Sequence, residues 1–357
     1  MKRIVLGISA GISLVLFLIL FLVSGRLGRG QISQTEAERW SDQKNVSQVS
    51  CFFTTNARIT LDTLEDLEHS IDNDLADNGI MPDPEKPGAR LWIDAYSASG
   101  EITLTTDRAT VSAEAIGVGG EFFQFHPLPL LYGYYFPADD VMTDYCVIDQ
   151  DAAWQLFGSS NVVGMTVYIS GIPHMITGVV KRGDSRLEKA AGLDKTLVYV
   201  SYETLNGLGY SRGLNHYEIV MPNPVSGFAA NYIKDKLGYS EKESEVVENT
   251  ARYSFLSGVK RIAKFGTRSM QNKAIIYPYW ENVARGYEDY LTAAILLELI
   301  FLGYAVLVIS GLLIYWWRHK NWTVSDVWHI VVDKLERLGE KLRAKRLEVM
   351  SQLRKSK

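Results

Sequence analysis

Two long apolar runs stand near the two ends of the chain, and a mixed pattern of apolar and polar residues lies between them. Residues 4–23 contain no charged side chain, and residues 291–317 contain only Glu298. A helix of about 20 residues spans the roughly 30 Å of hydrocarbon in a bilayer. We therefore predict two transmembrane helices, one at residues 1–25 and one at residues 291–317.

The first run has a competing interpretation as a cleaved signal peptide. The apolar part of a signal peptide is usually about 7–15 residues long and ends at a small-x-small cleavage site. Residues 4–23 are longer than that, and the exit Val23-Ser24-Gly25-Arg26 fits such a site poorly. We favour an uncleaved signal anchor. The second run has Tyr and Trp residues on both flanks and a basic segment after it, which is typical of an anchored helix.

The pattern between the two runs predicts an α+β domain. Five apolar residues recur at helical spacing from Leu61 to Leu75 and predict an amphipathic helix. Apolar and polar residues alternate over Arg90–Ser97 and Glu101–Thr106, which predicts two strands joined by a hairpin turn at Ser99-Gly100. A further strand is expected at Val111–Val118.

From residue 119 the predicted elements are mostly short strands. One short helix, Gln150–Leu156, interrupts them and begins at Asp149 or Gln150 as its cap. From Tyr217 the α+β pattern returns, with a helix at Val225–Leu237 between two strands. We therefore predict an α+β subdomain in two parts, residues 26–118 and 212–290, with a mostly-β insert at residues 119–211.

The net charge of the chain is −4, but the charges are unevenly distributed along it. Residues 1–25 carry +2, residues 26–290 carry −11 and residues 318–357 carry +6. Basic segments next to membrane helices stay on the cytoplasmic side. We therefore expect a two-pass protein of the cell membrane with both termini in the cytoplasm and residues 26–290 outside it.

Composition excludes several protein classes. The 37 Lys and Arg residues do not outnumber the 41 Asp and Glu residues, which argues against a nucleic-acid binder. With two cysteines, the chain is not a disulfide-stapled scaffold. For Cys51 and Cys146 we favour two buried thiols over a disulfide.

Three features are candidates for contacts in and beside the membrane. Gly7 and Gly11 form a small-xxx-small face, and Gly303 could supply a matching one, within this chain or between two chains. Glu298 is an intramembrane carboxylate that either faces a protein helix or snorkels to the interface. Residues 318–357 predict a basic amphipathic helix, whose candidate contact residues are Trp328, Leu335, Leu338, Lys341 and Arg343.

The sequence does not indicate an enzyme. Ser257-Gly-Val-Lys260 matches a serine–lysine nucleophile pattern but lacks the companion motifs. No G-x-x-x-x-G-K-[ST] is present, so a P-loop for ATP is missing. The six histidines do not show metal-ligand spacing, and we predict no metal or other cofactor.

Residues 116–180 carry motifs specific to one family. They are Gly119-Gly-Glu-Phe-Phe123, Leu131-Tyr-Gly133 with Phe136 and Asp139-Asp140, Cys146-Val-Ile-Asp149, Leu156-Phe-Gly158 and Ile176-Thr-Gly-Val-Val180. In order and spacing this region resembles the MacB-like periplasmic core domain of bacterial permeases of the MacB, lipoprotein-release and FtsX type. The resemblance implies a porter-like α+β subdomain with a mostly-β "sabre" insert, which agrees with the predicted layout.

The resemblance also implies partners. Members of this family are membrane components of ABC transporters, form dimers and couple ATP hydrolysis in the cytoplasm to movement of the exterior domain. It therefore implies a separate ABC ATPase, a further permease subunit and possible homodimers, with residues 318–357 contacting either the ATPase or membrane lipid. Family permeases have three helices after the exterior domain, whereas one is predicted here. The alternative is a membrane-anchored extracytoplasmic binding or sensor module without transport coupling.

Overall fold

A computed structural model describes residues 1–41, 45–82, 89–137, 143–271, 275–320, 328 and 332–339. It divides into two compact units, residues 20–297 and residues 1–19 with 298–357. The larger unit has the predicted α+β fold, between two helices that are long and apolar enough to cross a membrane.

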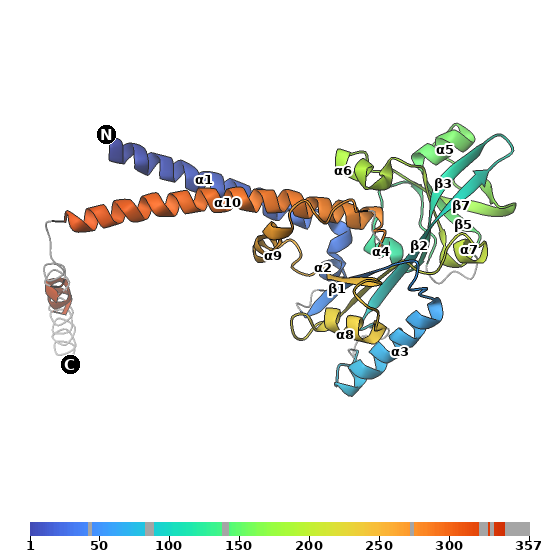
Figure 1. Cartoon of the computed structure of the whole chain (residues 1–357), viewed down its shortest axis with the longest axis horizontal. Helices are drawn as coiled ribbons and strands as arrows, with labels where there is room; N and C mark the ends of the chain where they lie inside the picture. The colour runs from blue at the N-terminus through green and yellow to red at the C-terminus, as the bar shows by residue number, and fades with distance from the viewer. Residues whose placement is uncertain are drawn as a thin grey trace, which may run out of the picture. The chain divides into compact units, whose positions relative to one another are not determined.

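A single ten-stranded sheet forms the centre of the larger unit (Figure 1). Its strands are β1 (Val46–Phe53), β2 (Ile93–Thr105), β3 (Thr110–Gly120), β4 (Leu130–Gly133), β5 (Tyr145–Asp149), β6 (Thr166–Ile169), β7 (Ile172–Val180), β8 (Leu197–Ser201), β9 (His216–Pro222) and β10 (Ser244–Glu248). The strand order is β10-β1-β9-β2-β3-β8-β5-β7-β4, and β6 pairs with β2 and β7. The pairs β3–β8 and β5–β7 are parallel, and the others are antiparallel. Strands of both predicted subdomains share this sheet, and the boundaries between them stay a prediction.

Short helices and turns connect the strands. They are η1 (Ile32–Gln34), α2 (Glu36–Trp40), α3 (Leu61–Asp77), α4 (Phe122–Phe125), α5 (Gln150–Phe157), α6 (Arg186–Glu188), η2 (Lys189–Leu193), α7 (Tyr202–Gly207), α8 (Phe228–Leu237), α9 (Phe255–Arg261) and η3 (Ile262–Lys264). The predicted helices α3 and α5 are confirmed, and each begins at a side-chain cap, Thr60 and Asp149 respectively. Helix α8 ends at the predicted Gly238 but begins three residues later than predicted, after Gly227.

Side chains alternate between the two faces of the sheet and build two cores. The first core holds Leu64 and Ile71 of α3 and Ile233 of α8, together with Cys51 of β1 and Cys146 of β5. Figure 1 shows α3 and α8 on the same side of the sheet. The second core lies on the other face, and its members include Val118, Phe122, Phe125, Tyr199, Val220 and Trp280.

The predicted hairpin turn at Ser99-Gly100 is wrong. Strand β2 runs through both residues, and the chain reverses at residues 106–109, where Thr106 N–H donates to Ala109 O at 2.8 Å. Gly100 is needed for a different reason, because a Cβ there would lie 2.6 Å from the backbone oxygen of Tyr210. A close approach between backbones requires glycine as strictly as a turn does.

The two candidate membrane spans are α1 (Lys2–Arg29) and α10 (Tyr279–Arg318). Helix α10 contains 40 residues, so its length is about 60 Å, about twice the thickness of the hydrocarbon core. The predicted span at residues 291–317 needs only the second part of it. Residues 279–290 extend this helix outside the predicted span.

In the smaller unit α1 and α10 pack against each other in antiparallel fashion. Ser9 Oγ lies 2.8 Å from the hydroxyl of Tyr304. One turn further along α1, Ser13 Oγ donates to the backbone oxygen of Phe301 at 2.9 Å. Small hydroxyl side chains allow close approach and supply hydrogen bonds between apolar helices.

Candidate functional site

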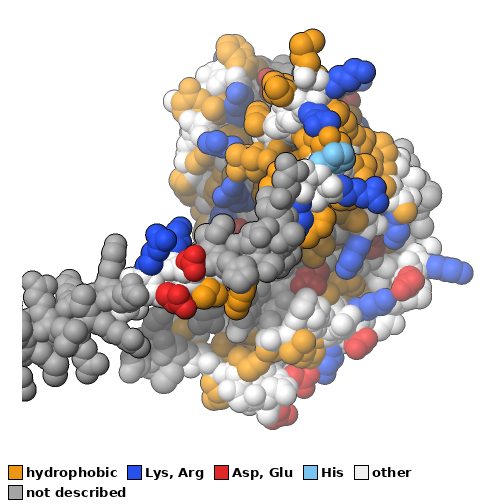
Figure 2. All heavy atoms as spheres, turned by 90° about the vertical axis from the view of Figure 1, so that its left-hand side faces the viewer, with side chains coloured by type: hydrophobic (Ala, Val, Ile, Leu, Met, Phe, Trp, Pro, Cys, Tyr) orange, Lys and Arg blue, Asp and Glu red, His pale blue; other side chains and the backbone are white. Residues whose placement is uncertain are grey.

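Two groups of ionisable side chains are buried within the described part of the larger unit. On the face drawn in Figure 2, Lys and Arg side chains lie scattered among hydrophobic ones. By contrast, β9 carries His216 and Glu218, which are both 0% exposed. These residues are two positions apart, so they point to the same face of the sheet. Their neighbours Tyr217 and Ile219 point into the first core.

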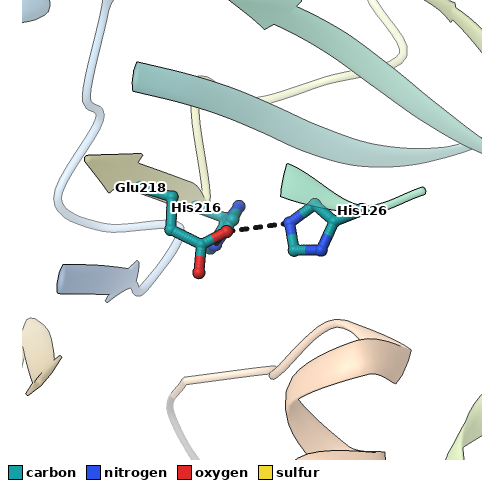
Figure 3. Close-up of side chains that lie close together, drawn as sticks. All are labelled: His126, His216 and Glu218. Atoms are coloured by element: carbon teal, nitrogen blue, oxygen red, sulfur yellow. Dashed lines mark ion pairs between the residues drawn. The ribbon is translucent and has the colours of Figure 1, made fainter. Parts of the chain in front are cut away.

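A third ionisable side chain comes from the end of α4. His126 is the C-terminal cap of this helix, and its ring stands opposite Glu218. His126 Nε2 lies 2.8 Å from Glu218 Oε2, and His216 Nε2 lies 3.6 Å from the same oxygen. One ring nitrogen of each histidine and one carboxylate oxygen of Glu218 all lie within 4.8 Å of one another. Figure 3 shows His126 and the Glu218 carboxylate pointing toward each other, with His216 beside the carboxylate.

Hydrogen bonds from other elements fix the orientation of this cluster. Glu218 Oε1 accepts from Gln48 Nε2 at 3.0 Å, from Asn249 Nδ2 at 3.4 Å and from the hydroxyl of Ser50. His216 Nδ1 lies 3.2 Å from Ser97 Oγ. Oε1 of Glu218 and Nδ1 of His216 are used in this way. The other two atoms, Glu218 Oε2 and His216 Nε2, make no hydrogen bond with the described residues.

The environment sets the protonation states. Burial lowers the pKa of His216 to about 4, so its ring is neutral at pH 7. Burial alone would raise the pKa of Glu218, but the neighbouring His126 ring and the hydrogen bond from Ser50 outweigh it, and the pKa lies below its usual value. The cluster therefore presents a carboxylate and a neutral imidazole. Such groups hold either a proton or a metal ion.

Helix α10 covers this cluster. The Trp280 ring lies 4.4 Å from the ring of His126 and 5.2 Å from that of His216, measured between centroids. Trp280 belongs to the first turn of α10 and is 5% exposed. The cluster is thus enclosed between β9, the end of α4 and the helix that continues into the predicted membrane span.

A second buried group of charges joins the start of α10 to the sheet domain. Arg252 forms a two-pronged ion pair with Glu281, with Nη1–Oε2 and Nη2–Oε1 distances of 2.8 and 2.9 Å. Its Nε donates to Glu288 Oε1 at 2.7 Å. All three side chains are at most 4% exposed. Paired contacts of this kind fix both distance and orientation.

Arg285 extends the group to strand β10. Its Nε donates to Glu281 Oε1 at 2.6 Å, and its Nη2 donates to Glu245 Oε1 at 3.0 Å. Burial alone would raise the pKa of Glu281, but Arg252 and Arg285 lower it to about 2. Glu281 therefore stays ionised, and the network composed of Arg252, Glu281, Arg285, Glu288 and Glu245 holds the first turns of α10 against β10 and the segment after it.

Among the residues predicted to pack the membrane helices, the three glycines have open surroundings, whereas Glu298 is buried. A Cβ on Gly7, Gly11 or Gly303 would meet no atom within 4 Å, and Gly7 and Gly11 are exposed. The described contact between α1 and α10 does not use them, because the serines of α1 on another face of the helix form it. A contact of these glycines with a second chain stays a prediction. Glu298 is 1% exposed, which favours contact with protein over snorkelling, and its role in helix packing stays a prediction.

The predicted tail residues are described only in part. Residues 332–339 are helical, and Leu335 and Leu338 on this helix are exposed, as is Trp328. Lys341 and Arg343 lie outside the described residues. The role of these five side chains in binding an ATPase or lipid remains a prediction.

Sequence reasoning missed both buried charge groups. The histidines were tested only for ligands close together in the chain, whereas His126 and His216 come from distant segments. The strand was also predicted to begin at Tyr217, one residue after His216. The detectable pattern was His216-x-Glu218 in an otherwise apolar strand, because alternation then turns both polar side chains to one face.

Comparison with known proteins identifies relatives of the chain. The sequence profile of the "MacB-like periplasmic core domain" matches residues 4–231. The macrolide export ATP-binding/permease protein MacB of Agrobacterium fabrum is 33% identical over 133 residues, 36% of this chain and 20% of the relative. The protein of the same name from Pasteurella multocida is 35% identical over 109 residues, 30% of this chain and 16% of the relative. The matched part thus spans a fifth or less of the length of these relatives.

Two solved structures are also similar. The extracellular domain of the noncanonical ABC-type transporter YknZ from Gram-positive bacteria matches with a TM-score of 0.39 and 17% identity, covering 56% of this chain and 99% of that domain. The periplasmic region of MacB from Actinobacillus actinomycetemcomitans matches with a TM-score of 0.41 and 18% identity, covering 59% and 92%.

Proposed function

Because the chain belongs to the family of the MacB-like periplasmic core domain, we propose that it is a permease-like membrane subunit of an ABC transporter. Its extracytoplasmic domain, residues 26–290, transmits conformational change or engages exterior cargo and partners. The relatives carry ATP binding and permease function in one protein, as their name states. Residues 1–357 contain no P-loop sequence, and the proposal assigns ATP hydrolysis to a separate ATPase chain.

The observation that supports transmission of motion is the buried ion-pair network at the start of α10. Displacing α10 from β10 would leave Arg252 or Glu281 buried without its partner, which costs several kcal/mol. The sheet domain and the first turns of α10 are therefore expected to move as one piece. Helix α10 is one continuous helix from Tyr279 to Arg318, and the proposal assigns to it the transmission of movement between the membrane and the sheet domain.

The contact with the ATPase is assigned to residues 318–357. The full chain is expected to co-purify, from membranes of its source bacterium in mild detergent, with a protein that carries a P-loop sequence. Deletion of residues 318–357 is expected to abolish that association and the ATP hydrolysis that accompanies it. Intact association and hydrolysis after the deletion would contradict coupling through the tail.

A matched pair of variants separates binding to the ATPase from adhesion to lipid. Lys341→Glu with Arg343→Glu weakens attraction to anionic lipid, by about 1 kcal/mol for each basic residue that is lost. Leu335→Ser with Leu338→Ser removes apolar contact area instead. An ATPase contact is expected to be lost with the leucines and to survive in high salt, whereas adhesion to lipid is screened by salt. If the full chain retains no ATPase at all, the anchored binding or sensor module becomes the better proposal.

The proposed topology has both termini in the cytoplasm and residues 26–290 outside. A cysteine at the exposed position Ser226 is expected to react with a membrane-impermeant maleimide in right-side-out vesicles. A cysteine in place of Ser351 is expected to react only after detergent is added. The natural Cys51 and Cys146 are 0% exposed and give little background. Reaction of the Ser351→Cys variant in sealed vesicles would overturn the topology.

A further inference from the structure

We propose that His126, His216 and Glu218 form a binding site for one Zn²⁺ ion per chain. The ligand atoms are Nε2 of both histidines and Oε2 of the glutamate. The site goes beyond the proposed transport function, since nothing in that function requires a metal ion. It lies within residues 20–297, in the second core and under Trp280.

The spacing of the three atoms suits a small tetrahedral ion. With Zn–N and Zn–O bonds of about 2.0–2.1 Å, neighbouring ligand atoms stand about 3.3 Å apart. The two separations from Glu218 Oε2 are 2.8 and 3.6 Å, and all three atoms lie within 4.8 Å of one another. These values lie on both sides of the tetrahedral spacing, so small side-chain rotations bring the three atoms around one ion.

An ion pair alone leaves part of this cluster unsatisfied. His126 Nε2 approaches Glu218 Oε2 closely, but neither atom makes an aligned hydrogen bond. His216 Nε2 also lacks a hydrogen-bond partner among the described residues, although the ring is fully buried. A proton between His126 and Glu218 would leave the lone pair of His216 without a donor. One cation satisfies all three atoms together.

For His216 and Glu218 the surrounding hydrogen bonds have the arrangement found around metal ligands, whereas His126 Nδ1 has no hydrogen-bond partner among the described residues. A ligating histidine normally donates its second ring N–H to an oxygen, which fixes the tautomer that leaves the other nitrogen free to bind. Ser97 Oγ stands 3.2 Å from His216 Nδ1 in that position. Gln48 and Asn249 likewise hold Glu218 through Oε1, the oxygen that is not used for the metal.

The ligand types select the class of metal. Two imidazoles and one carboxylate favour zinc and its neighbours in the first transition row over Mg²⁺ and Ca²⁺, which prefer sets of oxygen ligands. Three protein ligands leave a fourth position, which water fills in many zinc sites. The ion would tie the loop after α4 to β9 directly beneath the first turn of α10.

The test measures Zn²⁺ binding and the thermal transition of the full chain in detergent, after treatment with EDTA and removal of the chelator. We expect one Zn²⁺ per chain by calorimetry and an increase in Tm as Zn²⁺ is added, because a ligand that binds only the folded state stabilises it. Co²⁺ in place of Zn²⁺ is expected to give visible ligand-field bands. Mg²⁺ at the same concentration is expected to give no shift in Tm.

Variants make the assignment specific. His216→Asn and Glu218→Gln are expected to abolish the Zn²⁺-dependent increase in Tm, and Ser97→Ala to weaken binding about 10–100-fold as the loss of a positioning residue. His69→Asn, which removes an exposed histidine on α3, is the matched control and should bind as the unchanged chain does. Each variant is compared with itself with and without Zn²⁺, so a general loss of stability does not imitate loss of the site. Absence of stoichiometric binding, or equal binding by the Glu218→Gln variant, would overturn the proposal.

Discussion

Replacing Arg252 with alanine is expected to lower the free energy of unfolding of the domain by about 3–5 kcal/mol, because it removes the two-pronged partner of the buried Glu281 and one of the cations that pair with the buried Glu288. Among the residues that the structure describes, Glu281 then keeps Arg285 as its ion-pair partner. Urea unfolding of the full chain in detergent measures the change as a shift of the midpoint at constant slope. If α10 transmits motion, the same variant is also expected to uncouple ATP hydrolysis from movement of the exterior domain.

The matched control is Arg90→Ala. Arg90 pairs with Glu121 at 2.9 Å, but the two side chains are 65% and 35% exposed. Exposed pairs of this kind contribute about 0–1 kcal/mol. If Arg252→Ala and Arg90→Ala shift the urea midpoint equally, the buried network is not what holds α10 to the sheet domain.

Acid is expected to destabilise the domain through Glu281 by about 3 kcal/mol between pH 4.5 and pH 2. The folded-state pKa of Glu281 is about 2, whereas its ordinary value is 4.5. A pKa that is lowered on folding contributes stability above the unfolded value, and that contribution is lost as the pH falls toward the folded value. Urea midpoints measured at a series of pH values between 6 and 2 report the loss.

Glu281→Gln isolates this effect from the other carboxylates. The variant is expected to be less stable than the unchanged chain at pH 6 and to lose less stability on acidification, since glutamine does not titrate. Glu121→Gln at the exposed pair should leave the pH dependence almost unchanged. Parallel pH profiles for the unchanged chain and Glu281→Gln would show that Glu281 is not held ionised by Arg252 and Arg285.

Local patterns along the chain predicted the elements that depend on local physics. The spacing of leucines in α3, the cap at Asp149 and the stop at Gly238 each act over a few residues, and the structure confirms them. Gly100 was misread because a glycine in a close backbone contact looks the same in sequence as one in a turn. The contact is with Tyr210, whose position depends on the tertiary fold.

The buried charge groups depend on contacts that no short stretch of sequence contains. Arg252 and Glu281 are in contact although other elements separate them in the chain. The hydropathy pattern also placed the start of the second membrane helix at residue 291, after the charged first turns of α10. Glu281, Arg285 and Glu288 recur at intervals of four and three residues, which is the spacing of one helix face. That pattern predicts a charged helix face but not its burial.

The two cysteines carry a consequence for where this protein can fold. Cys51 of β1 and Cys146 of β5 are free and fully buried, and burial raises the pKa of both thiols, that of Cys146 to about 12. Because the thiolate is the reactive form, neither residue is a ready substrate for oxidation or disulfide exchange. The folded domain therefore holds no disulfide between these two cysteines, and reducing agents are expected to leave its stability unchanged.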